Sequence, residues 1–191
     1  MLKKNTEVAV SACLLGQAVR YDGKEKTHSL LVDCFTRLFS DQIALVPFCP
    51  EVGAGLGVPR PKIQLVRHKQ EPIRVLGVEN HTQDVTERIQ SYARVFIKQY
   101  PDIQYVIVKS RSPSCGYQST PLFKITDSDM SNRNLNLDLI KNVQVNYEQV
   151  AITSGMFVQT IMKLKPDLVL LDELNFSSEQ DCITFFKQVL S

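Results

Sequence analysis

Apolar residues recur along this chain with two different periods, and the two periods alternate. Segments with the alternating or continuous apolar pattern of buried strands span residues 7–12, 43–47, 105–109 and 167–171. Segments with apolar residues three and four positions apart, as in helices, span residues 29–39, 86–100, 150–164 and 178–190. Two further short strands are predicted at 63–66 and 73–78, joined by a charged turn.

Strands that alternate with helices predict a mainly parallel sheet whose two faces are covered by helices, with right-handed crossovers. The fold class expected is therefore α/β, a three-layer sandwich with a sheet of about five strands, flavodoxin-like or Rossmann-like. A chain of 191 residues is the size of one domain, and we expect a single domain over 1–191. The Gly- and Pro-rich stretch 50–61 predicts a long irregular loop, and the polar stretch 124–143 is a candidate lid.

Charge is balanced along the chain, and this balance helps only to exclude some classes of partner. Lys and Arg number 22 and Asp and Glu 20, a formal net charge of +2 without a basic block. This balance gives no reason to expect a nucleic-acid partner or a polybasic membrane patch. Apolar runs are too short to span a bilayer, and Glu7 interrupts the N-terminal stretch that would form an export signal. We therefore expect a cytoplasmic protein with no membrane partner.

The five cysteines divide into two groups. Their odd number, wide spacing and lack of an export signal disfavour a disulfide framework. Cys34 and Cys182 lie in stretches of helical periodicity, where a cysteine is usually a small buried hydrophobic residue. Cys13, Cys49 and Cys115 instead follow three predicted strands, and turn-forming Gly or Pro lies beside each of them.

Parallel strands bring their carboxyl ends to one edge of the sheet, so these three thiols are expected to converge there. No C-x-x-C pair is present, which disfavours a structural zinc site. Three thiolates without a fourth suit a 4Fe–4S cluster with one iron not ligated by protein. The three histidines, His28, His68 and His81, lie in polar surroundings and are expected at the surface rather than as a fourth ligand. The alternative is that three small apolar residues happen to lie where strands meet the core.

Six short motifs carry a resemblance to a known family. They are V-S-A-C-L-L-G at 10–16, V-R-Y-D-G at 19–23, V-P-F-C-P-E-V at 46–52, G-V-P-R-P at 57–61, D-V-T at 84–86 and K-S-R-S-P-S-C-G at 109–116. In this order and spacing they resemble the thiouracil desulfurases (TudS-type), formerly a domain of unknown function. The resemblance covers about residues 5–120 and weakens after about 120. Within the matching part, Gln64 stands where the family usually has a glutamate.

The resemblance implies a non-redox desulfuration that depends on an iron–sulfur cluster. Cys13, Cys49 and Cys115 would hold a 4Fe–4S cluster whose fourth iron binds the sulfur of a small thiolated substrate such as 2-thiouracil. Glu51 would be the proton-transfer residue, and Ser112 a second catalytic group. Possible contacts to substrate are Arg20, Tyr21, Asp22, Arg60, Ser110 and Ser114. Lys109 and Arg111 would offset the negative charge of a thiolate-bound cluster.

Simpler interpretations stand beside several of these assignments. Arg20 and Asp22 can instead form an ion pair that holds a turn, Arg60 can form an outward salt bridge, and serines can cap local backbone. For the whole protein, one alternative is a hydrolase with a cysteine nucleophile, although no histidine occurs in a motif that would supply its base. Another is a sensor or sulfur carrier that binds iron–sulfur or metal without catalysis.

Overall fold

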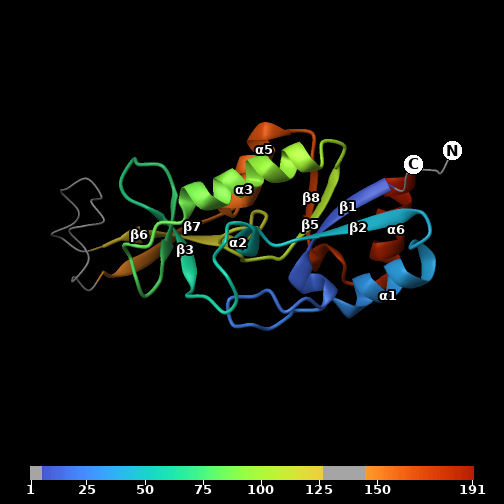
Figure 1. Ribbon diagram of the computed structural model, residues 1–191, viewed down its shortest axis with the longest axis horizontal. Helices are drawn as coiled ribbons and strands as arrows, with labels where there is room; N and C mark the ends of the chain where they lie inside the picture. The colour runs from blue at the N-terminus through green and yellow to red at the C-terminus, as the bar shows by residue number, and fades with distance from the viewer. Residues whose placement is uncertain (1–5, 127–144) are drawn as a thin grey trace.

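The computed structural model describes residues 6–126 and 145–191, which form two β-sheets with helices packed around them (Figure 1). Of the candidate lid at 124–143, residues 127–143 lie outside the described residues. Among the described residues, none of the helices combines the length and the apolar character that crossing a membrane requires.

The first sheet is fully parallel. Its strands, in spatial order, are β2 (Ile43–Phe48), β1 (Thr6–Ser11), β5 (Tyr105–Val108) and β8 (Val169–Asp172). Pro47 is tolerated because β2 is an edge strand, where one side of the backbone has no ladder to complete. All four strands correspond to predicted strands, and their parallel order brings their carboxyl ends to one edge.

Helices cover both faces of this sheet, as the alternation of the two periods predicts. On one face α1 (Ser29–Leu38) packs against α6 (Glu179–Leu190), and on the other α3 (Thr86–Gln99) packs against α5 (Met156–Leu164) (Figure 1). Phe96 of α3 and Phe157 of α5 pack against each other and against Phe48 of β2, with ring centroids 5.2–5.4 Å apart. The three-layer α/β prediction is confirmed.

The second sheet is mixed and lies beyond the first, on the left of Figure 1. Its order is β4 (Arg74–Gly77), β3 (Ile63–Arg67), β6 (Thr120–Ile125) and β7 (Tyr147–Thr153), with β3 and β6 parallel and the outer pairs antiparallel. One hydrophobic core cluster joins the two sheets, since it contains Leu65 and Val75 together with Ala9 and Val106.

One prediction about the strands is incomplete and another is wrong. The parallel sheet has four strands, near the five expected, but the two short strands predicted at 63–66 and 73–78 belong to a second sheet of four that also contains β6 and β7. The wrong prediction concerns the helix at 150–164. Residues Val150–Thr153 form the end of β7, and the helix begins only at Met156, after the break at Ser154 and Gly155. The β-branched residues of 150–153 pair with β6, a strand that the sequence patterns did not predict and that contains Pro121.

The histidines also depart from expectation in part. His68 is buried rather than exposed, so the surface assignment is wrong for this residue. His28 is half-buried, and its Nδ1 accepts a hydrogen bond from Leu31 N at the start of α1. His81 is also half-buried and lies 3.0 Å from the hydroxyl of Tyr147 through its Nδ1. None of the three lines the cavity described below.

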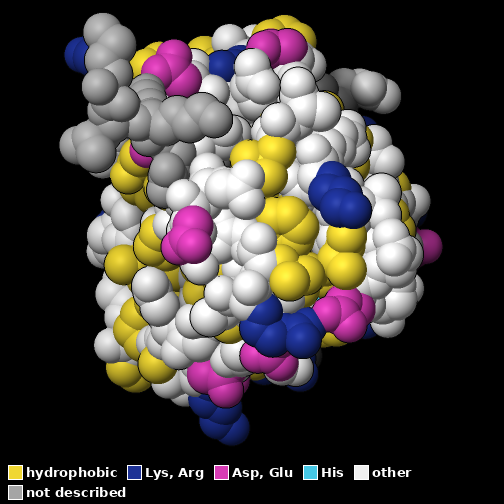
Figure 2. All heavy atoms as spheres, turned by 90° about the vertical axis from the view of Figure 1, so that its right-hand side faces the viewer, with side chains coloured by type: hydrophobic (Ala, Val, Ile, Leu, Met, Phe, Trp, Pro, Cys, Tyr) yellow, Lys and Arg dark blue, Asp and Glu magenta, His cyan; other side chains and the backbone are white. Residues whose placement is uncertain are grey.

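One face of the surface can be compared with the balanced charge of the sequence. Figure 2 shows the face at the right of Figure 1, where α1 and α6 lie. Apolar side chains form small groups there, and Lys, Arg, Asp and Glu are scattered between them.

Candidate active site

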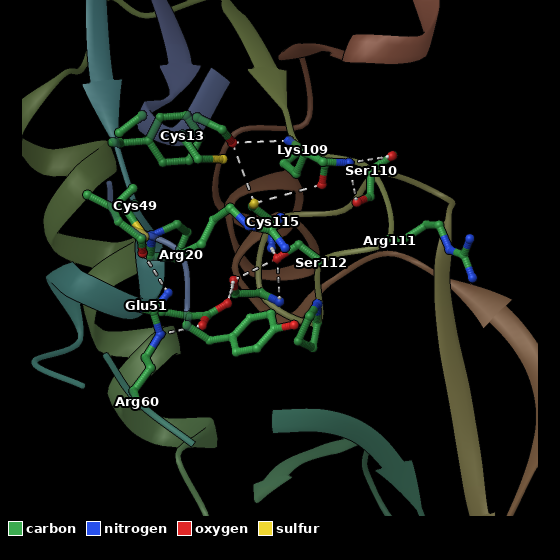
Figure 3. A pocket seen from close by; sticks show the side chains of 18 residues that line it. Cys13, Arg20, Cys49, Glu51, Arg60, Lys109, Ser110, Arg111, Ser112 and Cys115 are labelled. Carbon is green, nitrogen blue, oxygen red and sulfur yellow. Dashed lines mark hydrogen bonds and ion pairs between the residues drawn. The ribbon is translucent and has the colours of Figure 1, made fainter. Parts of the chain in front are cut away.

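A cavity of about 280 Å³ lies at the carboxyl ends of β1, β2 and β5. Cys13, Cys49 and Cys115 all line it, so the predicted convergence of the three thiols is confirmed as geometry. Figure 3 shows the three sulfur atoms on the same side of the cavity. The other predicted residues that line it are Arg20, Tyr21, Glu51, Arg60, Lys109, Ser110, Arg111, Ser112 and Ser114.

Each cysteine is presented by a turn that follows its strand, at once for Cys13 and Cys49 and after a longer loop for Cys115. Cys13 lies in a 3-10 turn, η1 (Ala12–Leu15), which ends at Gly16 with a φ of 85° that favours glycine. Cys49 precedes the short helix α2 (Pro50–Gly53), and its carbonyl accepts a hydrogen bond from Gly53 N. Cys115 lies in the loop after β5. These turns aim backbone and thiol toward the same cavity.

The thiols of Cys115 and Cys49 have weak polar neighbours. Cys115 Sγ lies 3.5 Å from the hydroxyl of Ser11, a residue that sequence reasoning missed. Ser11 Oγ in turn accepts a hydrogen bond from Lys109 N at 3.1 Å, which ties the ends of β1 and β5 together. Cys49 Sγ lies 3.8 Å from the carbonyl oxygen of Val19.

The start of α5 supports the loop that carries Cys115. Backbone amides of Gly155, Met156 and Phe157 donate to carbonyl oxygens of the loop, at Gly116, Pro113 and Ser114 respectively. Gly155 has an ordinary φ of −64°, so its backbone conformation does not require glycine. Glycine is required because the neighbouring backbone leaves no room for a side chain. A Cβ at this position would lie 2.8 Å from Cys115 N and closer still to the Ser114 carbonyl.

Replacing Gly155 by alanine is therefore expected to lower the free energy of unfolding by about 1–3 kcal/mol, the usual cost of overpacking. Urea denaturation of the iron-free protein measures the change. Lys163→Ala, an exposed position on the same helix, is the control and should change stability by less than about 0.5 kcal/mol. Equal stability of the two variants would contradict the close approach of α5 to the cysteine loop.

Burial keeps the three thiols protonated in the protein alone. It raises the pKa of Cys13 to about 12, with further raising contributions from Cys115 and Cys49. Arg20 and Lys109 act on the same thiol in the opposite direction. Burial likewise raises the pKa of Cys49 and of Cys115. A cysteine nucleophile needs the opposite, a thiol whose pKa is lowered by a base or cation.

Glu51 is a buried carboxylate, and both of its oxygens have partners. Arg60 Nε donates to Oε2 at 2.7 Å, and the hydroxyl of Ser114 donates to Oε1 at 2.7 Å. Ser114 Oγ lies 3.0 Å from Ser112 Oγ. Because the proton of Ser114 is used on the carboxylate, the hydroxyl of Ser112 must donate to Ser114. The two serines thus form a hydroxyl chain directed at Glu51.

Ser112 has a second task in the backbone. Its Oγ accepts from the amide of Ser114 at 3.3 Å and from that of Cys115 at 3.2 Å. This arrangement is the local capping that serine favours in turns. The same hydroxyl therefore shapes the turn before Cys115 and extends the chain from Glu51 into the cavity.

Arg60 points inward, so the interpretation as an outward salt bridge is wrong. Besides Glu51, its guanidinium donates to the carbonyl oxygens of Gly57 at 2.8 Å and Val19 at 2.9 Å. Three of its donors are thereby used on the protein itself, and its side chain is only 4% exposed. Arg60 fixes Glu51 and the two loops beside it.

Replacing Arg60 by methionine leaves the Glu51 carboxylate buried without its cation. Loss of one partner from a buried pair typically costs about 3–5 kcal/mol, and we expect that loss in urea denaturation of the iron-free protein. The matched control is Arg94→Met on α3, which removes an exposed pair with Glu87 and should cost less than about 1 kcal/mol. A comparable small cost for both would show that Arg60 does not anchor the site.

On the other side of the cysteines lies a second ion pair, between Lys109 and Glu173. Glu173 follows β8 and also accepts hydrogen bonds from Ser110 N at 2.6 Å and Ser110 Oγ at 2.7 Å. Burial raises the pKa of Glu173, but the hydrogen bonds from Lys109 and Ser110 lower it by more. Sequence reasoning did not select Glu173 as a site residue, because it lies beyond about residue 120, where the resemblance to the family weakens.

The V-R-Y-D-G segment is split between cavity and turn. Arg20 and Tyr21 line the cavity, and the Arg20 guanidinium lies 5.6 Å from the centre of the Tyr21 ring. Asp22 is exposed and does not line the cavity. It accepts from Lys24 N at 3.2 Å and pairs with Arg20 at 3.5 Å, which fits the turn-holding alternative. Gln64, the departure within the matching motifs, lies on β3 outside the cavity lining.

The donor set suits a cluster better than a single ion. In the described part of the chain, no three His, Cys, Asp or Glu side chains are close enough together to hold one metal ion. Three thiolates on one zinc ion would lie only about 3.8 Å apart, given Zn–S bonds of about 2.3 Å. A 4Fe–4S cluster instead offers a separate iron to each thiolate, so its ligands stand further apart. Three cysteines that line one cavity and yet are too far apart for one ion are compatible with that requirement.

Comparison with known proteins agrees with this geometry. The family model described as 2-thiouracil desulfurase matches residues 8–173. The chain belongs to the 2-thiouracil desulfurase family. The match continues past the last motif, which ends at residue 116, and it includes β8 and Glu173. The similarity to the family therefore extends further along the chain than the short motifs do.

One solved structure similar to this member of the 2-thiouracil desulfurase family is described as the [4Fe-4S]-dependent thiouracil desulfidase TudS. It matches with a TM-score of 0.58 and 23% sequence identity, over 95% of this chain and 99% of that chain. At this identity the likeness establishes the shared fold. A search of curated proteins gave no match.

Proposed function

We propose that the protein is a 4Fe–4S-dependent desulfurase that removes sulfur from a small thiolated compound, a thiopyrimidine such as 2-thiouracil. Membership of the 2-thiouracil desulfurase family supports this reaction class. The observation that carries the proposal is one cavity lined by Cys13, Cys49 and Cys115 together with the buried Glu51 carboxylate. Free thiols in this arrangement need a reducing compartment, so we place the reaction in the cytoplasm.

Cys13, Cys49 and Cys115 would hold the cluster. When bound, it supplies one iron without a protein ligand, a Lewis acid with affinity for a soft thiocarbonyl sulfur. Binding iron deprotonates a coordinating thiol, which offsets the burial that raises the pKa of all three. The protein contributes the remaining parts of the site, which are its proton donors and acceptors and its fixed charges.

Glu51 is the residue best placed to move protons. Hydrolytic loss of sulfur needs a base that activates water at the thiocarbonyl carbon and an acid that returns the proton. The carboxylate lines the cavity, and Arg60 and Ser114 fix its orientation. A base held in one orientation loses no entropy at each turnover.

The hydroxyls of Ser112 and Ser114 extend the reach of that carboxylate. Both donate toward Glu51, so a proton taken from a water or a ring nitrogen beside Ser112 can pass along the chain to Oε1. This supports Ser112 as the second catalytic group, with Ser114 as the link between Ser112 and Glu51.

A cysteine-nucleophile hydrolase has less support. None of the three histidines lines the cavity, and burial raises the pKa of each cavity thiol. A binding module without catalysis would have no use for a carboxylate and two hydroxyls directed at the same cavity.

The test is sulfide release by protein reconstituted with iron and sulfide without oxygen. We expect 2-thiouracil to yield hydrogen sulfide and uracil in equal amounts over many turnovers, measured by sulfide assay and chromatography. Protein carrying its cluster that converts neither 2-thiouracil nor other thiolated pyrimidine bases and nucleosides would reject the enzyme assignment and favour a sensor.

A further inference from the structure

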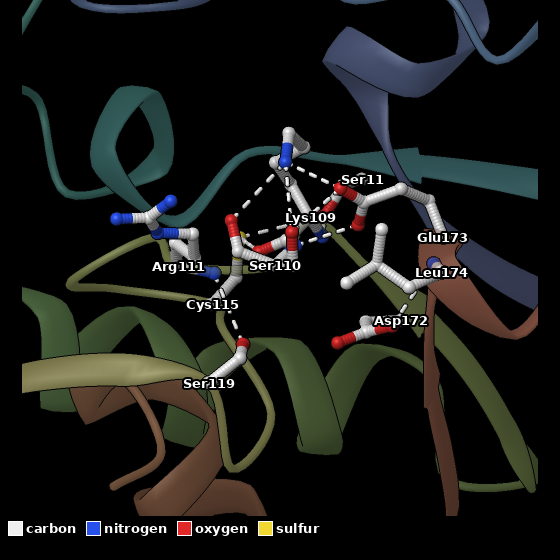
Figure 4. Close-up of polar contacts among 9 residues, drawn as sticks. All are labelled: Ser11, Lys109, Ser110, Arg111, Cys115, Ser119, Asp172, Glu173 and Leu174. Carbon is white, nitrogen blue, oxygen red and sulfur yellow. Dashed lines mark hydrogen bonds and ion pairs between the residues drawn. The ribbon is translucent and has the colours of Figure 1, made fainter. Parts of the chain in front are cut away.

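Two buried carboxylate–cation pairs flank the three cysteines, and only the first has a role in the proposed reaction. Glu51 and Arg60 form one pair, and Glu173 and Lys109 form the other. The second pair is bound to the segment that carries Cys115, and Figure 4 shows it with its neighbours.

Within the described part of the chain, the hydrogen bonds and the ion pair of the Glu173 side chain all go to two consecutive residues, Lys109 and Ser110. Its carboxylate accepts from Ser110 N at 2.6 Å, from Ser110 Oγ at 2.7 Å and from the ammonium of Lys109. Glu173 itself does not line the cavity, whereas Lys109 and Ser110 do. Whatever Glu173 contributes to the site must therefore act through these two residues.

The Lys109 ammonium is held in place from several directions. It donates to the Glu173 carboxylate, to Ser110 Oγ at 3.0 Å and to the Ser110 carbonyl at 3.2 Å. A lysine ammonium has three donors, and this set uses them all. The side chain is only 16% exposed, unlike most lysines. The ammonium is thus fully paired, and Lys109 lines the same cavity as Cys13.

Arg111, the other cation expected to offset thiolate charge, is placed differently. It is exposed, and Figures 3 and 4 show its guanidinium directed away from the cysteines. Its backbone has a φ of 60°, and its amide donates to Ser119 Oγ at 3.0 Å. Arg111 lines the cavity together with Lys109, as expected, but its guanidinium is directed away from the cysteines, so Lys109 is the better placed of the two to offset thiolate charge.

We propose that Glu173 is a positioning residue that fixes the Lys109 ammonium at the cavity wall, where this cation, together with Arg20, supplies positive charge beside the three thiolates. The inference rests on the proposed function only in that it takes the cysteines to work as thiolates. It gives a role to a residue 58 positions beyond Cys115 (173 − 115 = 58), directly after β8.

Removing the Glu173 carboxylate distinguishes two roles for Glu173, because they change the electrostatic potential at Cys13 in opposite directions. If Glu173 holds Lys109, its loss lets the flexible lysine side chain move into solvent, and the positive potential at Cys13 falls. If Glu173 only neutralises a lysine that stays in place, its loss raises that potential.

The experiment uses the whole chain without iron and compares two alkylating reagents at fixed pH, anionic iodoacetate and neutral iodoacetamide. The ratio of their rates at Cys13, measured by mass spectrometry, cancels differences in thiolate fraction and access. We expect Lys109→Met and Glu173→Gln each to lower this ratio about threefold or more, and Lys109→Arg to keep it. Glu148→Gln, which breaks the exposed pair with Lys124 on β6 and β7, should leave it unchanged.

A raised or unchanged ratio in Glu173→Gln would overturn the positioning role. A crystal structure of this variant gives a second readout, and Lys109 still at the cavity wall would overturn it as well. Both measurements use protein without iron, so their outcome does not depend on whether the protein is a desulfurase.

Discussion

Cys115→Ala protein reconstituted without oxygen is expected to retain no stable cluster and to release no sulfide from 2-thiouracil. Cys115 is one of three thiols on the cavity, and the described part of the chain offers no histidine there to replace it. Two thiolates leave two irons of the cluster without protein ligands, which exposes it to loss. Iron and acid-labile sulfide per chain measure the first effect, and a sulfide assay the second.

Cys34→Ala is the matched control. Cys34 is also a buried free thiol, but it lies in α1 and packs in the hydrophobic cluster shared with α6, away from the cavity. It should keep its iron and its activity, apart from a modest loss of stability. If Cys34→Ala and Cys115→Ala lost iron alike, the loss would reflect general unfolding. If Cys115→Ala kept about four irons, the ligand set proposed here would be wrong.

Glu51→Gln is expected to keep its cluster and to lose about 10²–10⁴-fold in kcat, the usual contribution of a general base. Glutamine preserves the size of the side chain and can still accept from Ser114, but it cannot take up a proton. Steady-state sulfide release gives kcat, and the iron content of the same sample shows that the cofactor is intact.

Glu87→Gln on α3 controls for the loss of a carboxylate in an ion pair, since Glu87 pairs with Arg94 at the surface. Its kcat should match the unchanged protein. A Glu51→Gln enzyme with normal kcat would exclude Glu51 as the base. A Glu51→Gln enzyme that loses iron as well as activity would show that Glu51 has a structural role in the site.

The positions of the cysteines were predictable from the sequence for a physical reason. Parallel strands end at one edge of a sheet, and Cys13, Cys49 and Cys115 follow strands that are recognisable from their apolar runs. Glu51 lies two residues after Cys49, and Ser112 and Ser114 lie just before Cys115, so their placement at the cavity follows from that of the cysteines. The layers of helices were equally predictable, because α1, α3 and α6 have clear apolar stripes.

What the sequence did not predict depends on partners far apart in the chain. The strand β6 contains Pro121 and exists because β3 and β7 pair with it on either side. Residues 150–153 form a strand for the same reason, although their apolar spacing also permits a helix. Glu173 meets Lys109 across 64 positions, and no local pattern encodes that ion pair.

The measurement that tests the central claim most directly is the iron and acid-labile sulfide content of the unchanged protein after reconstitution without oxygen, with 2-thiouracil turnover on the same sample. The account predicts about four irons per chain and continuing release of sulfide. Failure to take up iron while Cys13, Cys49 and Cys115 are reduced and intact would contradict it.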